Sequence, residues 1–383
     1  MNINQRYNSQ IYGKKRKNTP HPKFRYILLF LLFTIGIFLL IQYINSIANP
    51  RILVKTMTSI PGYTASSTLS IQKEALLLKT GGIIKSVDAK GTMNWIIKSG
   101  LQAPEISISS DALLLYENKT VKAYKATGSL LFQKEISDPI LDAKIGLKFA
   151  ALLFRSPDSS YSITLLDLVT SKVVDTIKLP GQSITNMGFR NDNSFWVISL
   201  DTNSATPISR ITTYNPGKSL TGAITIPEQI IYRIIFTGDN ILAVGTNSIL
   251  CYNSTGQKQE ETMIYGWNLF SVSPDKNGSF NMLLTHENIS SLKNSDSITS
   301  IRLINNQFKD IPLTLSLPCR KFFMLEQKMV CVSRSELRVI GYEKQDIIQI
   351  PLPFPIEDIL LSESGKTLYI LQNGKLFSHP ISF

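Results

Sequence analysis

Cysteine is scarce in this chain, with three residues among 383. Cys251, Cys319 and Cys331 are too few for a disulfide-rich scaffold, and they have no C-x-x-C spacing for zinc or thiol redox chemistry. Cys319 and Cys331 flank a predicted hairpin and could form a disulfide outside the reducing cytosol, although two buried free thiols fit the sequence equally well. The cysteines therefore predict no metal site and leave one disulfide as an open possibility.

Histidine is equally scarce, which restricts the catalytic chemistry available to the protein. His21 lies in a basic N-terminal stretch, His286 in a polar segment that is expected to be a loop, and His379 in the last expected strand. A Ser-His-Asp site needs a histidine beside a nucleophile, and neither a G-x-S-x-G nor an H-E-x-x-H motif occurs. We therefore expect no catalytic and no cofactor-binding residue, and we interpret the protein as not being an enzyme.

Acidic residues are absent from the first 25 positions, which carry seven of the 40 Lys and Arg residues. The rest of the chain has 33 basic and 28 acidic residues, so the formal net charge of +12 is concentrated at this end. Basic clusters beside an apolar segment orient it in a membrane and argue against a nucleic-acid partner. The residues to which we assign this topogenic role are Lys14, Lys15, Arg16, Lys17, Lys23 and Arg25.

Charged residues are also missing between Tyr26 and Pro50. The apolar run from Ile27 to Ile47 would span roughly 31 Å as a helix, which matches a bilayer core. We predict a transmembrane helix over residues 26–48, with a cytoplasmic tail at 1–25 and an extracytoplasmic domain at 50–383. A cleaved signal peptide is the alternative, but the apolar run is longer than a typical signal-peptide core.

The exported part of the sequence contains internal repeats. Residues 69–95 align without gaps with residues 106–132, so that Gly91 matches Gly128 and Trp95 matches Phe132. Each copy has the pattern of four short strands; those of the second copy are expected at 106–109, 112–116, 120–125 and 129–136. A single four-stranded sheet cannot bury both faces, whereas several sheets arranged around an axis can.

Weaker copies continue to the C-terminus, and the last one ends after its third strand. We expect residues 52–58 to supply the missing fourth strand, because joining the two ends would close the ring and remove exposed sheet edges. Seven complete units and this shared unit predict an all-β fold, an eight-bladed β-propeller, with seven blades as the alternative. No helical periodicity of useful length follows Pro50, which disfavours an α-helical solenoid.

Two turns resemble those of known propellers. The segment from Asp88 to Trp95 resembles the D-A-x-x-G-x-x-x-W turn of quinoprotein-type repeats, and residues 362–369 resemble the S-P-D-G-K-x-L-Y hairpin common in bacterial WD40-like propellers. The whole layout is similar to uncharacterised single-pass β-propeller proteins of Gram-positive bacteria, a DUF5711-like family. The resemblance implies a fold and an anchor but no chemistry. Quinoprotein dehydrogenases often carry adjacent cysteines, which this sequence lacks, so no cofactor is expected.

The sequence favours a membrane-tethered scaffold at the cell envelope that binds an unknown protein or an envelope polymer. The alternative is an extracytoplasmic enzyme or sensor that uses the propeller channel, and acidic or histidine side chains converging at the channel mouth would favour it. Trp95 and Phe132 recur in the repeats, which indicates packing between blades. Trp267 has no equivalent in the other repeats, so it is the aromatic residue that we would mutate first.

Overall fold

A computed structural model describes residues 31–40, 57–156, 160–190, 193–201, 203–238, 240–274, 280–286, 298–325, 328–342, 347–352 and 355–381. The chain divides into two compact units, Met1–Arg51 and Ile52–Phe383. In the first unit, residues 31–40 form an exposed helix. No helix within the described ranges is long and apolar enough to cross a membrane. The rest of the predicted transmembrane helix at 26–48, and all six topogenic basic residues, lie outside the described residues.

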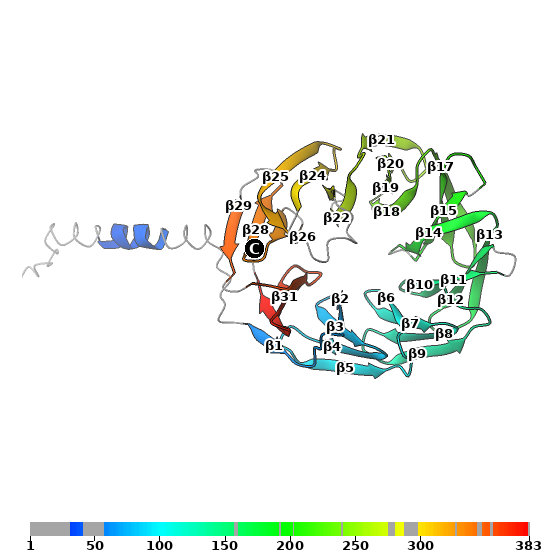
Figure 1. Cartoon of the computed structure of the whole chain (residues 1–383), viewed down its shortest axis with the longest axis horizontal. Coiled ribbons are helices and arrows are strands. Elements are labelled where there is room, and N and C mark those ends of the chain that lie inside the picture. Colours follow the sequence, from blue (N-terminus) through cyan, green and yellow to red (C-terminus); the bar gives the residue numbers. More distant parts are fainter. Residues whose placement is uncertain are drawn as a thin grey trace, which may run out of the picture. The chain divides into compact units, whose positions relative to one another are not determined.

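The second unit is an eight-bladed β-propeller, which confirms the favoured prediction (Figure 1). Blades 1 to 4 contain β2 (Thr68–Gln72), β3 (Ala75–Thr80), β4 (Ile83–Val87) and β5 (Met93–Lys98); β6 (Glu105–Ile108), β7 (Ala112–Glu117), β8 (Thr120–Lys125) and β9 (Leu130–Glu135); β10 (Asp142–Ile145), β11 (Phe149–Arg155), β12 (Tyr161–Asp167) and β13 (Val173–Leu179); and β14 (Gln182–Phe189), β15 (Phe195–Asp201), β16 (Ile208–Asn215) and β17 (Ser219–Pro227).

Blades 5 to 8 contain β18 (Ile231–Thr237), β19 (Asn240–Gly245), β20 (Ser248–Tyr252) and β21 (Lys258–Met263); β22 (Asn268–Pro274), β23 (Phe280–Thr285), β24 (Ile298–Asn305) and β25 (Asp310–Cys319); β26 (Lys321–Met324), β27 (Lys328–Val332), β28 (Glu336–Gly341) and β29 (Ile347–Pro351); and β30 (Asp358–Leu361), β31 (Thr367–Gln372), β32 (Lys375–Pro380) and β1 (Thr58–Ile60). All strand pairs within a blade are antiparallel, and the first strand of each blade is the innermost in the ring (Figure 1).

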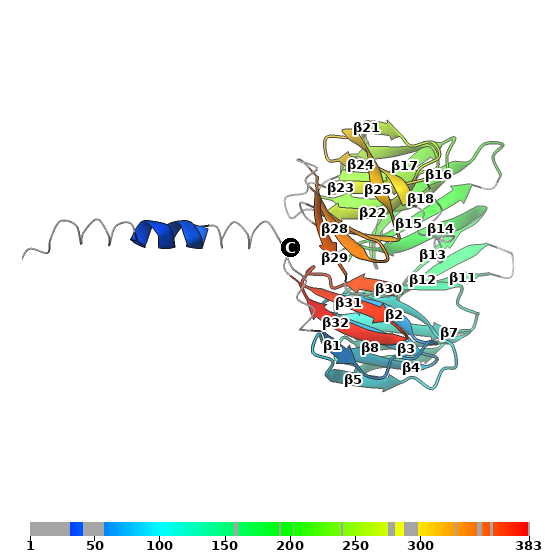
Figure 2. The same cartoon turned by 60° about the vertical axis from the view of Figure 1, so that its left-hand side comes forward.

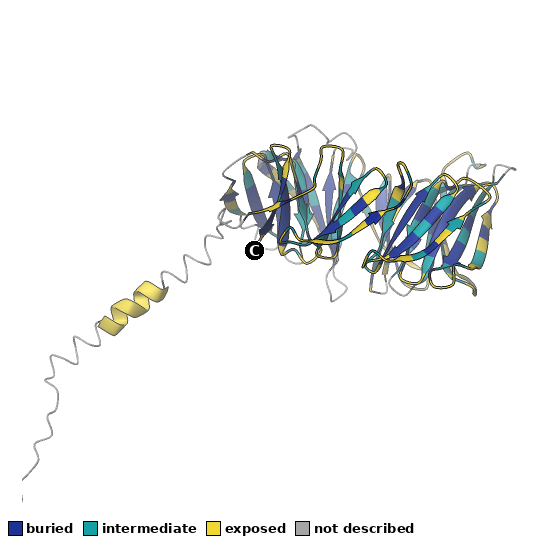
Figure 3. Ribbon diagram, turned by 90° about the horizontal axis from the view of Figure 1, so that it is seen from below, coloured by how far each residue is buried: buried dark blue, intermediate teal, exposed yellow. Residues whose placement is uncertain are grey.

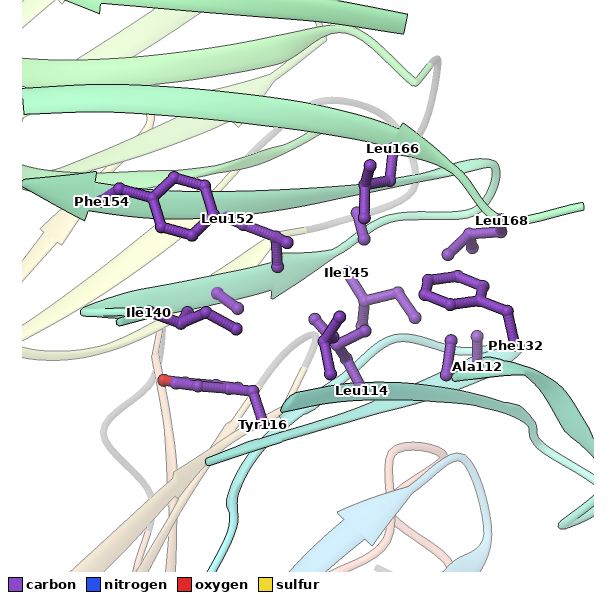
Figure 4. Packing of buried hydrophobic residues seen from close by; sticks show 14 residues of the cluster. Ala112, Leu114, Tyr116, Phe132, Ile140, Ile145, Leu152, Phe154, Leu166 and Leu168 are labelled. Carbon is purple, nitrogen blue, oxygen red and sulfur yellow. The ribbon is translucent and has the colours of Figure 1, made fainter. Parts of the chain in front are cut away.

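The second strand of each blade forms most of the core, because it is covered on both faces by neighbouring blades. In β7, for example, the five residues from Ala112 to Tyr116 are all buried. Figure 4 shows how Leu114 and Tyr116 of blade 2 pack against Leu152 and Phe154 of blade 3. Burial follows the strands throughout the ring, and exposed residues gather at the loops (Figure 3).

One contact between adjacent blades recurs around the ring. The turn before the outermost strand of one blade lies on the outermost strand of the preceding blade. In blade 2 this turn contains Gly128, whose φ is +83° and whose added Cβ would lie 2.8 Å from the ring of Trp95 in blade 1. The Trp95 indole N–H also donates to the carbonyl of Ala126 at 2.7 Å. Trp95 therefore packs blades together, as its recurrence predicted, and Phe132 is likewise buried.

The ring is closed by β1, which pairs with β32 as the fourth strand of blade 8 (Figure 2). Ser59 and Gly91 repeat the contact between adjacent blades here, because an added Cβ on Gly91 would lie 2.8 Å from the Ser59 carbonyl oxygen. An N-terminal strand pairs with the C-terminal blade, as expected. Its described part, Thr58–Ile60, shares Thr58 with the expected segment at 52–58, and residues 52–56 lie outside the described residues. Ile60 is the apolar residue of this strand that fits the core of blade 8, where it is 3% exposed.

The strand directions define two faces of the propeller. The proximal face carries the turns between the first and second and between the third and fourth strands of each blade. It also holds the N-terminal end of β1 and the C-terminal end of β32. The distal face carries the connections between blades and the turns between second and third strands. The chain therefore enters and leaves the propeller on its proximal face.

Stability is expected to fall as the pH drops below the ordinary histidine pKa of 6.5, because His379 in β32 is buried. Burial removes water from the ring and lowers its pKa below the ordinary value of 6.5. Below its ordinary pKa, this histidine binds a proton more readily in the unfolded chain than in the folded chain. The free energy of unfolding is therefore highest above the ordinary pKa and falls below it, by at most about 1.4 kcal/mol per pH unit. Urea unfolding of H379Q at several pH values should give a flatter profile than the unsubstituted chain. A pH profile of H379Q as steep as that of the unsubstituted chain would contradict the prediction.

Candidate functional site

Acidic side chains lie at the distal ends of inner strands, as the first residues of β6, β10 and β30, and lysines pair with those of β10 and β30. Asp142 of β10 forms an ion pair with Lys144 at 2.9 Å, and Asp358 of β30 forms one with Lys321 of β26 at 2.7 Å. Tyr116 also donates to Asp142 at 3.1 Å, and burial together with this carboxylate raises the pKa of Tyr116. Within the described ranges, no group of three or more His, Cys, Asp or Glu residues is placed to hold a metal ion.

The distal surface between blades 5 and 6 is the more distinctive site, and it is built on a tight turn that connects β21 to β22. The backbone N–H of Trp267 donates to the carbonyl of Ile264 at 2.8 Å, and Gly266 has a φ of +75° that favours glycine. The turn leaves Tyr265 63% exposed and holds Trp267 half-buried against the core shared by blades 5 and 6. One aromatic ring is thus fixed in place while its neighbour is presented to solvent.

Two side chains from blade 6 contact the Trp267 ring. His286, which follows β23, stacks on it with ring centroids 3.5 Å apart, and its Nδ1 lies 3.3 Å from the Gly266 carbonyl oxygen. The Arg302 guanidinium of β24 lies 5.3 Å from the ring centroid, a cation–π distance. The site therefore joins three segments that are separated in sequence: the turn at 264–267, the end of β23 and the middle of β24.

Arg302 is fixed by contacts of its own. Its Nε lies 3.0 and 3.1 Å from the two carboxylate oxygens of Asp310, its Nη2 also contacts Asp310, and the same nitrogen donates to the Met263 carbonyl at 3.1 Å. The side chain is 15% exposed, so this ion pair is partly shielded from water. Arg302 thereby links blade 6 to the end of β21 in blade 5. The result is a surface with an aromatic residue, a cation and a histidine held together at its middle.

A disulfide joins Cys319 at the distal end of β25 to Cys331 in β27. Their Cα atoms are 5.9 Å apart, within the normal range for disulfides, and both residues are completely buried. The bond connects blade 6 to blade 7. Cys251 is a buried free thiol, and burial raises its pKa, which makes it unreactive at neutral pH.

The sequence located part of this site. Trp267 was singled out because the other repeats have no equivalent residue, and it lies at the centre of the cluster. His286 was interpreted as an ordinary exposed histidine, and its stacking on Trp267 was missed. Arg302 and Asp310 were missed completely. The only signal in the sequence is a pair of opposite charges eight residues apart, which is too common to indicate a site.

Solved structures with the same fold have little sequence in common with this chain. The C-terminal WD40 domain of Sif2 has a TM-score of 0.58 at 14% identity, with 85% of this chain and 99% of that chain covered. BamB from Moraxella catarrhalis has a TM-score of 0.52 at 10% identity, with 85% and 100% covered. Sqt1 from Saccharomyces cerevisiae has a TM-score of 0.53 at 9% identity, with 85% and 100% covered. At these identities the likeness establishes the fold alone.

Sequence comparisons add a family but no activity. A model described as a family of unknown function (DUF5711) matches residues 54–303, which include blades 1 to 5 and most of blade 6. No curated protein matches the sequence. The matched region contains Trp267, His286 and Arg302 but ends before Asp310 and the disulfide.

Proposed function

Since the chain belongs to the DUF5711 family, whose function is unknown, we propose a role from its own surfaces. The protein is a membrane-tethered scaffold whose propeller lies outside the cytoplasm and binds a protein partner through the distal face around Trp267. The observation that carries this proposal is the Trp267 cluster, in which a fixed aromatic ring, a shielded arginine and an exposed tyrosine lie together. In this role the propeller performs no catalysis.

The distal site has the composition of a protein-binding surface. Binding energy at protein interfaces is concentrated in tryptophan, tyrosine and arginine residues that are held rigidly near the middle of a patch. Here Tyr265 is 63% exposed and Met263 is 47% exposed beside the buried part of the cluster. An aromatic residue fixed before binding loses little conformational entropy when a partner covers it.

The tether and its orientation are supported by features outside this site. The apolar run from Ile27 to Ile47 follows a basic tail with no acidic residue, which places the tail in the cytoplasm under the positive-inside rule. The Cys319–Cys331 disulfide suits an oxidising compartment. Because the chain enters the propeller on the proximal face, the distal face carries no covalent connection to the tether and is available to a partner.

The Y265A substitution is expected to weaken partner binding by roughly 30-fold or more, which is the loss typical of an interface hot spot. The measurement is quantitative proximity labelling by the full chain in membranes of cells that express it, followed by affinity measurement on the enriched protein. L141A is the matched control, since Leu141 is an exposed apolar residue on the same face between blades 2 and 3. Equal labelling of the same neighbours by Y265A and the unsubstituted chain would contradict the proposal.

A further inference from the structure

Exposed apolar residues recur on the proximal face of blades 1 to 4, where the outermost strands begin. We call this set the proximal rim: Met93, Leu130, Val169, Val173 and Leu220. Val169 lies in the turn before β13 and is 85% exposed, and each of the others is more than half exposed. Apolar surface is therefore exposed at equivalent places in four successive blades. These places lie on the face where β1 enters the ring.

An exposed lysine accompanies the apolar residue in each of these blades. Lys90, Lys125, Lys172 and Lys218 precede Met93, Leu130, Val173 and Leu220, and Lys148 lies in the first turn of blade 3. None of the five makes an ion pair with another residue in the described part of the chain. The rim thus combines apolar side chains with exposed lysines that make no direct ion pair.

The acidic side chains of the same turns accept hydrogen bonds from backbone N–H groups. Asp88 accepts hydrogen bonds from the N–H groups of Lys90 and Thr92, both at 2.8 Å. Asp167 accepts the N–H groups of Val169 at 3.0 Å and Thr170 at 2.7 Å, and these bonds lower its pKa. These carboxylates shape the turns, while the lysines of the same turns are directed to solvent. Both carboxylates keep their negative charge, so the net positive charge of the rim comes from the excess of its five lysines over these two acids.

We propose that the proximal rim lies against an anionic phospholipid surface, with its lysines at the headgroups and its apolar side chains in the interfacial layer. Alternating basic and apolar residues are the composition of peripheral membrane-binding surfaces. The proposal rests on the membrane tether of the proposed function, because the rim is continuous with β1, where the chain arrives from its apolar N-terminal segment. It makes the propeller a domain that is held in one orientation, with its distal face directed outward.

The test uses the full chain reconstituted into vesicles of phosphatidylcholine, with or without phosphatidylglycerol. An environment-sensitive fluorophore is attached at V169C, since Cys251 is buried and the other two cysteines are bonded to each other. The matched control is A205C, an exposed position in the turn between β15 and β16 on the distal face. In vesicles that contain phosphatidylglycerol, the label at 169 should shift to shorter wavelength and be quenched by a lipid-borne quencher, and the label at 205 should do neither.

Charge reversal separates lipid contact from simple proximity. The triple variant K125E/K172E/K218E should reduce the population in contact with anionic vesicles on the order of 100-fold, because each lysine near such a surface contributes a factor of roughly five. The control K98E/K119E/K178E makes the same change of charge at exposed lysines on the distal side and should keep the shift at 169.

Each outcome decides between the two proposals. If the full chain fails to float with either type of vesicle, the tether is wrong, and the rim contact is wrong with it. If the chain floats but the labels at 169 and 205 respond alike, the tether stands and the rim contact is overturned. Shielding of residue 169 only after a membrane protein is added would also overturn the lipid contact, in favour of a protein on the proximal face.

Discussion

The I60D substitution is expected to destabilise the propeller by at least about 4 kcal/mol, although it changes a single residue near the edge of the domain. Ile60 is 3% exposed and packs in one core with Leu76 of blade 1 and Leu376 of blade 8. Losing a buried isoleucine costs about 2–5 kcal/mol, and an unpaired carboxylate in its place adds the cost of removing a charge from water. The damage is not local, because β1 joins the first and last parts of the chain.

Equilibrium unfolding in urea measures this effect, and S59D is its matched control. Ser59 is the neighbouring residue in the same strand, but its side chain is exposed, so the same new charge remains in water. The control is expected to stay within about 0.5 kcal/mol of the unsubstituted chain, as surface substitutions usually do. Similar unfolding midpoints for I60D and S59D would show that the ring does not depend on β1.

Loss of the Cys319–Cys331 disulfide is expected to destabilise the protein by about 3 kcal/mol, from the entropy that a cross-link of this length removes from the unfolded chain. The two residues are 12 apart in sequence, and both are completely buried. The double variant C319A/C331A should unfold at lower urea concentration than the unsubstituted chain. The bond joins blade 6 to blade 7, so the separation of these two blades is the local opening that it opposes.

Hydrogen exchange can locate this effect. Amides of β25 and β27 should lose more protection in C319A/C331A than amides of β7 and β11, which lie in blades far from the bond. Reduction of the unsubstituted chain with dithiothreitol should reproduce the loss, whereas C251A should not, because Cys251 is unbonded. An unfolding curve that is insensitive to both the double substitution and the reductant would contradict the prediction.

The repeat pattern predicted blades 1 and 2 closely, because the repeat period and the positions of the turn residues give the same alignment of the two copies. The third strand of blade 2 was expected at 120–125 and is β8 at Thr120–Lys125, and the equivalence of Gly91 with Gly128 reflects a real contact between blades. The expected closing segment at 52–58 begins with the apolar run Ile52–Val54, whereas the strand that the structure describes is Thr58–Ile60 and buries Ile60. A short strand is fixed by the core that it fills, and this core includes Tyr369 and Leu376, which are more than 300 positions away in sequence.

The candidate site was harder to predict, since it depends on contacts between blades. A repeat period gives the position of a residue within its blade, but the direction of a side chain across to the next blade depends on tertiary packing. Trp267 was noticed because it breaks the pattern. His286 and Arg302 follow the pattern, and their association with Trp267 becomes visible only when β23 and β24 lie beside the turn at 264–267.

The sharing of blade 8 between the two ends of the chain has a consequence for biogenesis. β1 is synthesised before all other strands of the propeller and β32 after them, so the ring cannot close until β32 has been synthesised. Until that moment β1 has no strand to pair with, and the core that Ile60 enters lacks Leu376 of β32. The nascent protein therefore passes through a state with an open sheet edge and exposed apolar surface, the kind of state that aggregates unless a chaperone covers it.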